Sequence, residues 1–238
     1  MCALAAPARA LGAQGHARRS SRPALTLLHS SARRRAGVCR VLTESVDLAV
    51  GTKAPDFALP EPLTGKTVTL ADVSAGAKAT LVCFICNHCP YVVLLKDAIK
   101  AVAADYSARG VGVVAISSNS VETHPQDGPD AMAKDARELG YPFPYLYDAT
   151  QDVARAFKVA CTPEFFVFDA DLGLVYHGQF DDSRPKNGVT PTGKDLRAAL
   201  DAVLAGQPAP KGRPSIGCNL KWHPGQEPDW YGTQQVKK

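Results

Sequence analysis

The pentapeptide at residues 86–90, Cys-Asn-His-Cys-Pro, lies between an apolar run and a stretch with helical periodicity. The segment at 79–85 predicts a buried strand, and apolar residues at helical spacing predict a helix over 89–108. The N-terminus of a helix carries unpaired N–H groups and a partial positive charge, which favour a thiolate over a thiol. The spacing also lets the two sulfurs close a disulfide within one turn. We therefore expect a redox-active dithiol where a strand meets a helix.

The rest of the pattern alternates strands and helices before it ends in a hairpin and a helix. A turn at 64–66 separates two short strands, and 111–117 is a second buried strand. Further predicted elements are a helix over 130–139, a strand end at 145–147, a helix over 151–158, a hairpin of 165–168 with 174–176, and a helix over 195–205. Thr192 and Asp195 have the spacing of a capping box for this last helix.

This order resembles the thioredoxin-like proteins. The tripeptide Cys161-Thr162-Pro163 precedes the predicted hairpin, at the point where these proteins carry a cis-proline beside the dithiol. The Ala-Pro-Asp-Phe segment at 54–57, the Gly-Lys turn at 65–66 and the strand at 81–84 are similar to the redoxin branch, which comprises AhpC/TSA-type (alkyl hydroperoxide reductase/thiol-specific antioxidant) and related thiol–disulfide oxidoreductases. The resemblance spans residues 48–205. It implies an α/β, three-layer fold whose mixed central sheet has helices on both faces, and a role in antioxidant defence or redox homeostasis.

The motif assigns roles within the dithiol. Cys86 comes first and is expected to be exposed, so we predict that it is the nucleophile, with Cys89 as the resolving cysteine. His88 as an imidazolium would stabilise the thiolate and make the disulfide more oxidising, and the alternative is a solvated side chain with little influence. We expect Asn87 to help tune the dithiol.

On the opposite side of the dithiol, the resemblance implies that Thr162 and a cis-Pro163 lie against the sulfurs. Thioredoxins also carry a buried Asp six residues before the first cysteine, where this chain has Thr80. Glu164 is a candidate substitute, and the alternative is a solvated strand residue. Ile85 stands where a Trp commonly precedes the first cysteine.

A peroxidase function is disfavoured. Peroxiredoxins need Pro-x-x-x-Thr/Ser-x-x-Cys, and counting back from Cys86 gives Cys83 and Ala79, whereas counting back from Cys89 gives Cys86 and Val82. Neither register matches, so we expect dithiol–disulfide exchange and no dedicated peroxidase.

Additional cysteines support a rival hypothesis. Cys83, Cys86 and Cys89 are evenly spaced, and Cys161 is expected nearby, so thiolates with His88 form a candidate site for copper(I), zinc or an iron–sulfur cluster. The cluster is disfavoured because Cys83 lies inside a predicted strand, which leaves a thioredoxin-fold copper or metal chaperone as the rival function. The simpler interpretation makes Cys83 a core residue and Cys161 a core residue or an auxiliary thiol. A redox-inert interaction module with the same fold is a further alternative.

Charge separates the chain into parts. Residues 1–40 hold eight of its 27 basic residues, all Arg, and no acidic residue, so the other 19 basic residues face 23 acidic ones and give the remainder a net charge of −4. This Ala-, Arg- and Ser-rich leader, over 1–42, is typical of an organellar transit peptide, and we expect a chloroplast rather than a mitochondrion. A basic arm that binds nucleic acid is the alternative, but the leader has no aromatic residue to stack on bases.

After the leader we expect one domain over 48–205 and an extended tail over 206–238 that holds Cys218, which would reach the dithiol only if the tail folded back. No run has the length of a membrane span. Because no nucleotide or flavin motif is visible, we expect no cofactor. Electrons would then pass to or from a protein or small-molecule thiol.

Overall fold

The computed structural model describes residues 42–232. Its strands are β1 (Leu42–Glu44), β2 (Ala58–Pro60), β3 (Thr67–Thr69), β4 (Ala79–Phe84), β5 (Val111–Ser117), β6 (Tyr145–Tyr147), β7 (Cys161–Thr162), β8 (Glu164–Asp169), β9 (Leu174–Gly178) and β10 (Ile216–Asn219). Its helices are α1 (Leu70–Ser74), α2 (Pro90–Ser107), the 3-10 turn η1 (Pro125–Asp127), α3 (Pro129–Leu139), α4 (Asp152–Ala156) and α5 (Lys194–Leu204). The leader expected over 1–42 lies outside this range except for its last residue.

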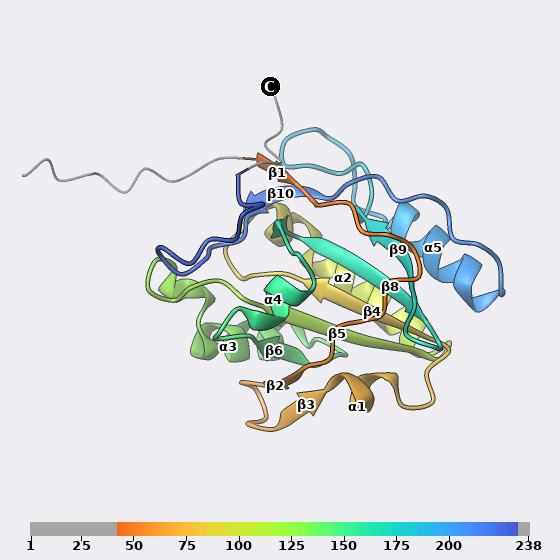
Figure 1. Ribbon diagram of the computed structural model, residues 1–238, viewed down its shortest axis with the longest axis horizontal. Helices are drawn as coiled ribbons and strands as arrows, with labels where there is room; N and C mark the ends of the chain where they lie inside the picture. Colours follow the sequence, from red (N-terminus) through yellow and green to blue (C-terminus); the bar gives the residue numbers. More distant parts are fainter. Residues whose placement is uncertain (1–41, 233–238) are drawn as a thin grey trace, which may run out of the picture. The chain divides into compact units, whose positions relative to one another are not determined.

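The central sheet has the order β6-β5-β4-β8-β9, with β4 in the middle (Figure 1). β4 runs parallel to β5 and antiparallel to β8, and all six of its residues are buried. Continuous apolar runs are typical of strands covered on both faces. The mixed sheet and the β8–β9 hairpin predicted from the sequence are confirmed.

Helices cover both faces of this sheet, as predicted. One face packs against apolar residues of α2, α3 and α5, including Ile99, Met132 and Leu200. The other face packs against α1, α4 and the segment around β2, through Leu70, Ala154 and Phe157 among others. The aromatic side chains of β8 alternate between the two cores, which is the expected result of the period-two geometry of a strand.

Helix α2 begins where its sequence dictates. Pro90 is its first residue, where a missing N–H costs little, and Cys89 is its N-cap. Val92, Leu95 and Ile99 lie on the buried side of the helix. The helix predicted over 89–108 is therefore confirmed to within one residue at each end.

A second, three-stranded sheet has the order β1-β10-β7 and joins distant parts of the chain. Its middle strand, β10, comes from the segment expected as an extended tail. Gly217 is required here, because a Cβ at this position would lie 2.0 Å from the carbonyl oxygen of Thr162. The close approach of β10 to β7 thus depends on a residue without a side chain.

The capping box expected at Thr192 and Asp195 is wrong. Gly193 is the N-cap of α5, with a left-handed φ of 69°. The buried carboxylate of Asp181 instead accepts the backbone N–H groups of Thr192 and Gly193, each at 2.7 Å. A distant carboxylate therefore replaces the local cap that the sequence spacing indicated. A true capping box occurs at Thr69 and Asp72, at the start of α1.

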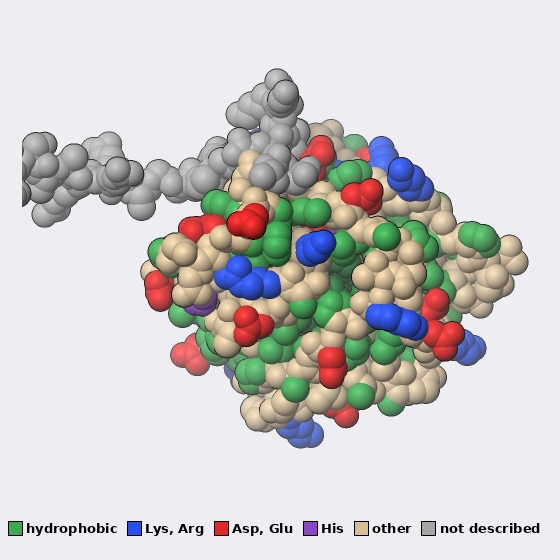
Figure 2. Space-filling model, in the orientation of Figure 1, with side chains coloured by type: hydrophobic (Ala, Val, Ile, Leu, Met, Phe, Trp, Pro, Cys, Tyr) green, Lys and Arg blue, Asp and Glu red, His purple; other side chains and the backbone are tan. Residues whose placement is uncertain are grey.

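On the face of the molecule in Figure 2, acidic and basic side chains are interspersed among apolar ones. This face therefore shows no stripe of basic residues of the kind that tracks a nucleic-acid backbone. Among the helices within residues 42–232, none combines the length and apolar character needed to cross a membrane.

Candidate functional site

The two cysteines of the motif lie where β4 gives way to α2. Cys86 follows the strand in the connecting turn, Cys89 is the helix N-cap, and both are free thiols. Their exposed fractions are only 1% and 0%. The expectation that Cys86 is exposed is therefore wrong, because the loop that carries Thr162 covers the sulfurs.

Thr162 and Pro163 form the cover of the dithiol. The peptide bond between them is cis, as the resemblance implied. The Thr162 hydroxyl lies 3.5 Å from the Sγ atom of Cys86, and the Cys89 thiol donates to the Thr162 carbonyl oxygen at 3.3 Å. One residue of this loop thus contacts both sulfurs.

A buried carboxylate, Asp127, organises the other side of the motif. Its Oδ1 atom accepts the backbone N–H groups of Asn87 and His88 at 2.8 and 3.2 Å. Its Oδ2 atom lies 2.6 Å from His88 Nδ1 and accepts from the Asn119 amide at 2.8 Å. Burial raises the pKa of Asp127, but the hydrogen bonds from His88 and Asn119 outweigh it and hold this pKa below its ordinary value.

The residues between the two cysteines are therefore fixed in place. The Asn87 amide donates to the Gln126 carbonyl oxygen and accepts from the Tyr145 hydroxyl, both at 3.0 Å. The half-buried His88 ring stacks on His124 with a centroid distance of 4.9 Å. The alternative of a freely solvated His88 is wrong, because this side chain is bound to a buried carboxylate.

The structure places Glu164 in the interior, so the alternative of a solvated strand residue is wrong. One carboxylate oxygen accepts the N–H groups of Ala160 and Cys161, and the other lies 2.6 Å from His177 Nε2. His177 stacks on Phe166 at a centroid distance of 4.3 Å. The thiol that Glu164 contacts is Cys161, at 3.9 Å. Both Glu164 oxygens thus have structural partners.

Cys83 and Cys161 are both buried thiols. Cys83 belongs to β4 and faces the core beneath α2, so burial raises its pKa. Burial and the neighbouring Glu164 carboxylate raise the pKa of Cys161 well above its ordinary value. Burial therefore favours the neutral thiol at both positions.

Among residues 42–232, the donor atoms that lie close enough together to hold a metal ion come from a different set. Cys86, His88 and Asp127 offer one atom each, and these atoms lie within 4.8 Å of one another. Only Cys86 and His88 belong to the ligand set expected from the sequence.

The charges around the two motif sulfurs are unequal. Burial raises the pKa of Cys86, and the Cys89 sulfur and the Asp127 carboxylate raise it further. Hydrogen bonds from the thiols of Cys218 and Cys86 lower the pKa of Cys89. Since the sulfurs interact strongly, they titrate as a unit, with the negative charge favoured at the helix N-terminus.

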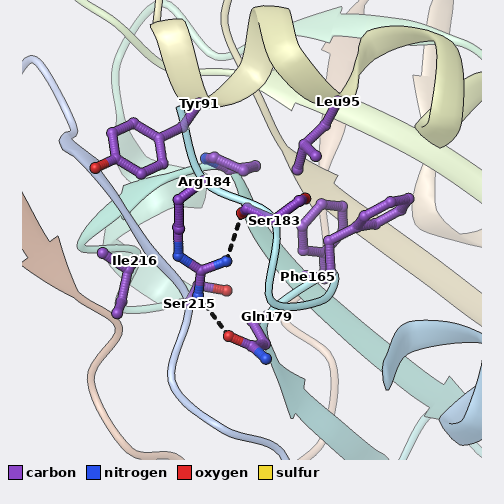
Figure 3. A pocket seen from close by; sticks show the side chains of 10 residues that line it. Tyr91, Leu95, Phe165, Gln179, Ser183, Arg184, Ser215 and Ile216 are labelled. Atoms are coloured by element: carbon purple, nitrogen blue, oxygen red, sulfur yellow. Dashed lines mark hydrogen bonds between the residues drawn. The ribbon is translucent and has the colours of Figure 1, made fainter. Parts of the chain in front are cut away.

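A small hollow lies beside the loop that carries Thr162 and Pro163, between α2 and β8. Tyr91 and Leu95 project into it from α2, and the Arg184 side chain lies across it (Figure 3). Arg184 donates to the carbonyl oxygens of Asp181 and Ser183, each at 2.7 Å, and also to the Gln179 side chain. The volume of about 10 Å³ is the space one water molecule needs, so the hollow is too small for an organic cofactor.

Sequence reasoning missed Asp127, Asn119 and Tyr145. A signal for Asp127 and Asn119 was present, because both lie in the polar stretch after β5. In a parallel sheet the loops at the carboxyl ends of adjacent strands lie side by side. A carboxylate after β5 is therefore a natural neighbour for residues 86–89, which follow β4.

A comparison with protein-family models identifies this domain. The model of the AhpC/TSA family matches residues 50–177, which is more than half of the chain. The chain belongs to the AhpC/TSA family. The matched residues include the Cys86–Cys89 motif and Thr162-Pro163 but not Cys218.

Solved structures show the same architecture. An uncharacterized conserved protein from Geobacillus kaustophilus is 53% identical, with a TM-score of 0.75, and the match covers 77% of this chain and 97% of that one. A hypothetical protein from Sinorhizobium meliloti 1021 is 48% identical, with a TM-score of 0.75 and coverage of 77% and 100%. The comparison with curated proteins gives no match.

A more distant match is named for its chemistry. It is a putative thiol:disulfide interchange protein, DsbE, from Chlorobium tepidum, with 26% identity, a TM-score of 0.52 and coverage of 66% and 99%. Together with the sheet order, this likeness shows that the AhpC/TSA domain has a thioredoxin-like fold.

Proposed function

We propose that this AhpC/TSA-family protein is a thiol–disulfide oxidoreductase whose reactive group is the Cys86–Cys89 dithiol, with a role in redox homeostasis. The observation that carries the proposal is that both sulfurs, which lie at the N-terminus of α2, contact Thr162. A helix N-terminus and a fixed His–Asp pair are the surroundings that tune a thiol for exchange. The named likeness to a thiol:disulfide interchange protein supports it.

In the proposed reaction, Cys86 passes its proton to the neighbouring Cys89 sulfur, and the Cys86 thiolate formed in this way attacks one sulfur of a substrate disulfide while the other sulfur leaves as a thiolate. Cys89 then attacks the mixed disulfide at Cys86, closes the internal bridge and releases the second substrate thiol. Two electrons pass to the substrate, and a protein or small-molecule thiol must restore the dithiol. The leader supports action in an organelle, which we propose to be the chloroplast.

Insulin reduction with dithiothreitol tests this proposal. The full-length protein is expected to accelerate precipitation of the insulin B chain, and Cys86→Ser is expected to abolish the acceleration. Cys83→Ala is the matched control, because Cys83 lies three residues earlier but faces the core. A wild-type protein without turnover would instead favour the redox-inert module. If the protein does reduce insulin, its reduction potential would assign the physiological direction of exchange, since a value near those of thioredoxins indicates a reductase.

A dedicated peroxidase is a weaker candidate despite the family name. Neither cysteine register has the threonine or serine and the proline that the peroxide site needs. Rapid hydrogen peroxide consumption that required Cys86 but not Cys89 would contradict this conclusion.

Metal binding is the second candidate, and the Cys86–His88–Asp127 trio favours it. A sulfur, a nitrogen and an oxygen donor suit zinc better than copper(I), which prefers soft ligands. Binding would have to displace the hydrogen bond between His88 and Asp127. One tightly held zinc or copper ion per reduced chain, without insulin reduction, would reverse the order of the two proposals.

A further inference from the structure

Cys218 lies outside the matched family domain, yet β10 brings it to the dithiol. In the antiparallel ladder between β10 and β7, Cys218 is directly opposite Thr162. Opposite residues in such a ladder present their side chains on the same face. Thr162 contacts both motif sulfurs, so Cys218 is held on the side of the sheet where they lie.

Cys218 packs against the apolar cluster that contains Cys86 and Cys89. Hydrogen bonding with the thiols of Cys218 and Cys86 lowers the pKa of Cys89. Cys89 is therefore the middle member of a row of three thiols. Cys218 is the partly exposed end of this row, whereas Cys86 and Cys89 are buried.

We propose that Cys218 is a third redox thiol, which exchanges with the Cys86–Cys89 disulfide to form a Cys89–Cys218 disulfide. The proposal rests on the proposed function, which generates the first disulfide. The Cys218 thiolate attacks the Cys89 sulfur, the bond between Cys86 and Cys89 breaks, and Cys86 leaves with the electron pair as a thiolate. Cys86 takes up the proton that Cys218 has lost. One disulfide replaces another, so no further oxidant or reductant is needed.

The electrostatics of the row support this direction after oxidation. In the reduced protein, the hydrogen bond to Cys89 raises the pKa of Cys218, and burial adds to this effect. Oxidation of Cys89 weakens this hydrogen bond, while the positive charge of Lys221 continues to favour a Cys218 thiolate. The exchange would replace a disulfide between two buried cysteines with one that includes the half-buried Cys218, whose sulfur a partner thiol reaches more easily.

Disulfide mapping in the full-length protein tests the proposal. The Cys86→Ser variant is treated with oxidised dithiothreitol, remaining thiols are alkylated, and the bonds are mapped by mass spectrometry with fragmentation. A Cys89–Cys218 bond is expected, and it should persist in Cys86→Ser/Cys161→Ser. This second variant is the matched control, because Cys161 is a buried thiol close to the same row. A free Cys89, or a Cys89–Cys161 bond, would overturn the proposal.

The wild-type protein gives a second readout that needs no substitution at Cys86. After oxidation with the same reagent, free thiols are labelled with N-ethylmaleimide. If Cys86 is labelled and Cys218 is protected, the disulfide has moved to Cys89 and Cys218, as proposed. If, of these two residues, only Cys218 is labelled, the disulfide has stayed between Cys86 and Cys89 and the proposal is overturned. If the wild type fails to reduce insulin although Cys89–Cys218 forms in Cys86→Ser, the proposed function fails and the third thiol stands. If insulin is reduced but no Cys89–Cys218 bond forms in either protein, only the third thiol fails.

Discussion

The Nδ1 atom of His88 lies 2.6 Å from the Oδ2 atom of Asp127, and this pair borders the dithiol. Asp127 is fully buried and raises the pKa of the neighbouring Cys86 thiol. His88 hydrogen-bonds to this carboxylate and partly neutralises it, which reduces the effect of the carboxylate on Cys86. We therefore propose that the His88–Asp127 pair tunes the dithiol.

Replacing His88 by Ala is expected to lower the reduction potential of the Cys86–Cys89 pair. Without the imidazole, the Asp127 charge acts on Cys86 with less compensation, so the reduced form becomes less favourable. We expect a fall of roughly 30 mV, which corresponds to a tenfold change in the equilibrium constant. Equilibration against glutathione buffers measures it, and an unchanged potential would exclude the tuning role.

The matched variant Asp127→Asn is expected to shift the potential in the opposite direction. The amide keeps a similar shape but removes the negative charge that raises the pKa of Cys86. A potential that fell in both variants would indicate a merely structural effect of the pair.

Asp127 is also expected to make stability depend on pH. Its pKa in the folded protein is below the ordinary value, so its stabilising contribution is complete above the unfolded pKa, which is about 4. The contribution is lost as the pH falls further, toward the folded pKa. The difference in unfolding free energy between wild type and Asp127→Asn should therefore shrink from pH 6 to pH 3, measured by urea denaturation at each pH. A constant difference would contradict this linkage.

The fold was largely predictable because its signals are local. The apolar run of β4, the spacing in α2 and the β8–β9 hairpin each depend on side chains that are close in sequence. The dithiol and Thr162-Pro163 were found in the same way, through short motifs. Contacts across the sheet have no local motif of this kind, and only the place of the polar stretch after β5 indicated that it lies beside residues 86–89.

The partners of the dithiol were missed for this reason. Asp127 is 39 residues from His88, and the strand that holds Cys218 pairs with one more than 50 residues earlier. Cys86 is buried because the loop with Thr162, which is distant in sequence, covers it, and nothing in residues 86–90 themselves requires this burial. Tertiary packing, which local patterns do not encode, thus decided the exposure of the dithiol and its charge balance.

Thr162→Val is expected to slow the reaction of the dithiol with a small disulfide. When Cys86 is a thiolate, the Thr162 hydroxyl at 3.5 Å can only donate to it and so stabilises the charge. Loss of one such hydrogen bond costs about 1 kcal/mol, which slows the reaction roughly fivefold. Stopped-flow kinetics at constant pH measure the rate. Thr162→Ser should restore most of the rate. If Thr162→Val reacted as fast as Thr162→Ser, the hydroxyl would have no role in stabilising the thiolate.

Glu164→Ala is expected to destabilise the fold by roughly 3–5 kcal/mol, because it leaves His177 and two backbone N–H groups without their buried partner. Glu164→Gln keeps an acceptor oxygen and should cost less. Urea denaturation measures both. If Glu164 instead exchanged protons with the dithiol, Glu164→Gln would change the pH profile of insulin reduction, while the free energy of unfolding of this variant would stay near that of the wild type.

Gly217→Ala is expected to separate β10 from the dithiol. The added Cβ would lie 2.0 Å from the Thr162 carbonyl oxygen and 2.7 Å from its carbon, and these backbone atoms cannot yield as a side chain could. The reduced variant should therefore expose Cys218, which maleimide should label faster than in the wild type. Ile216→Ala is the control, since it shortens a side chain on the same strand without adding an atom near Thr162. Equal labelling rates in the wild type and Gly217→Ala would mean that β10 does not hold Cys218 against Cys89 in solution.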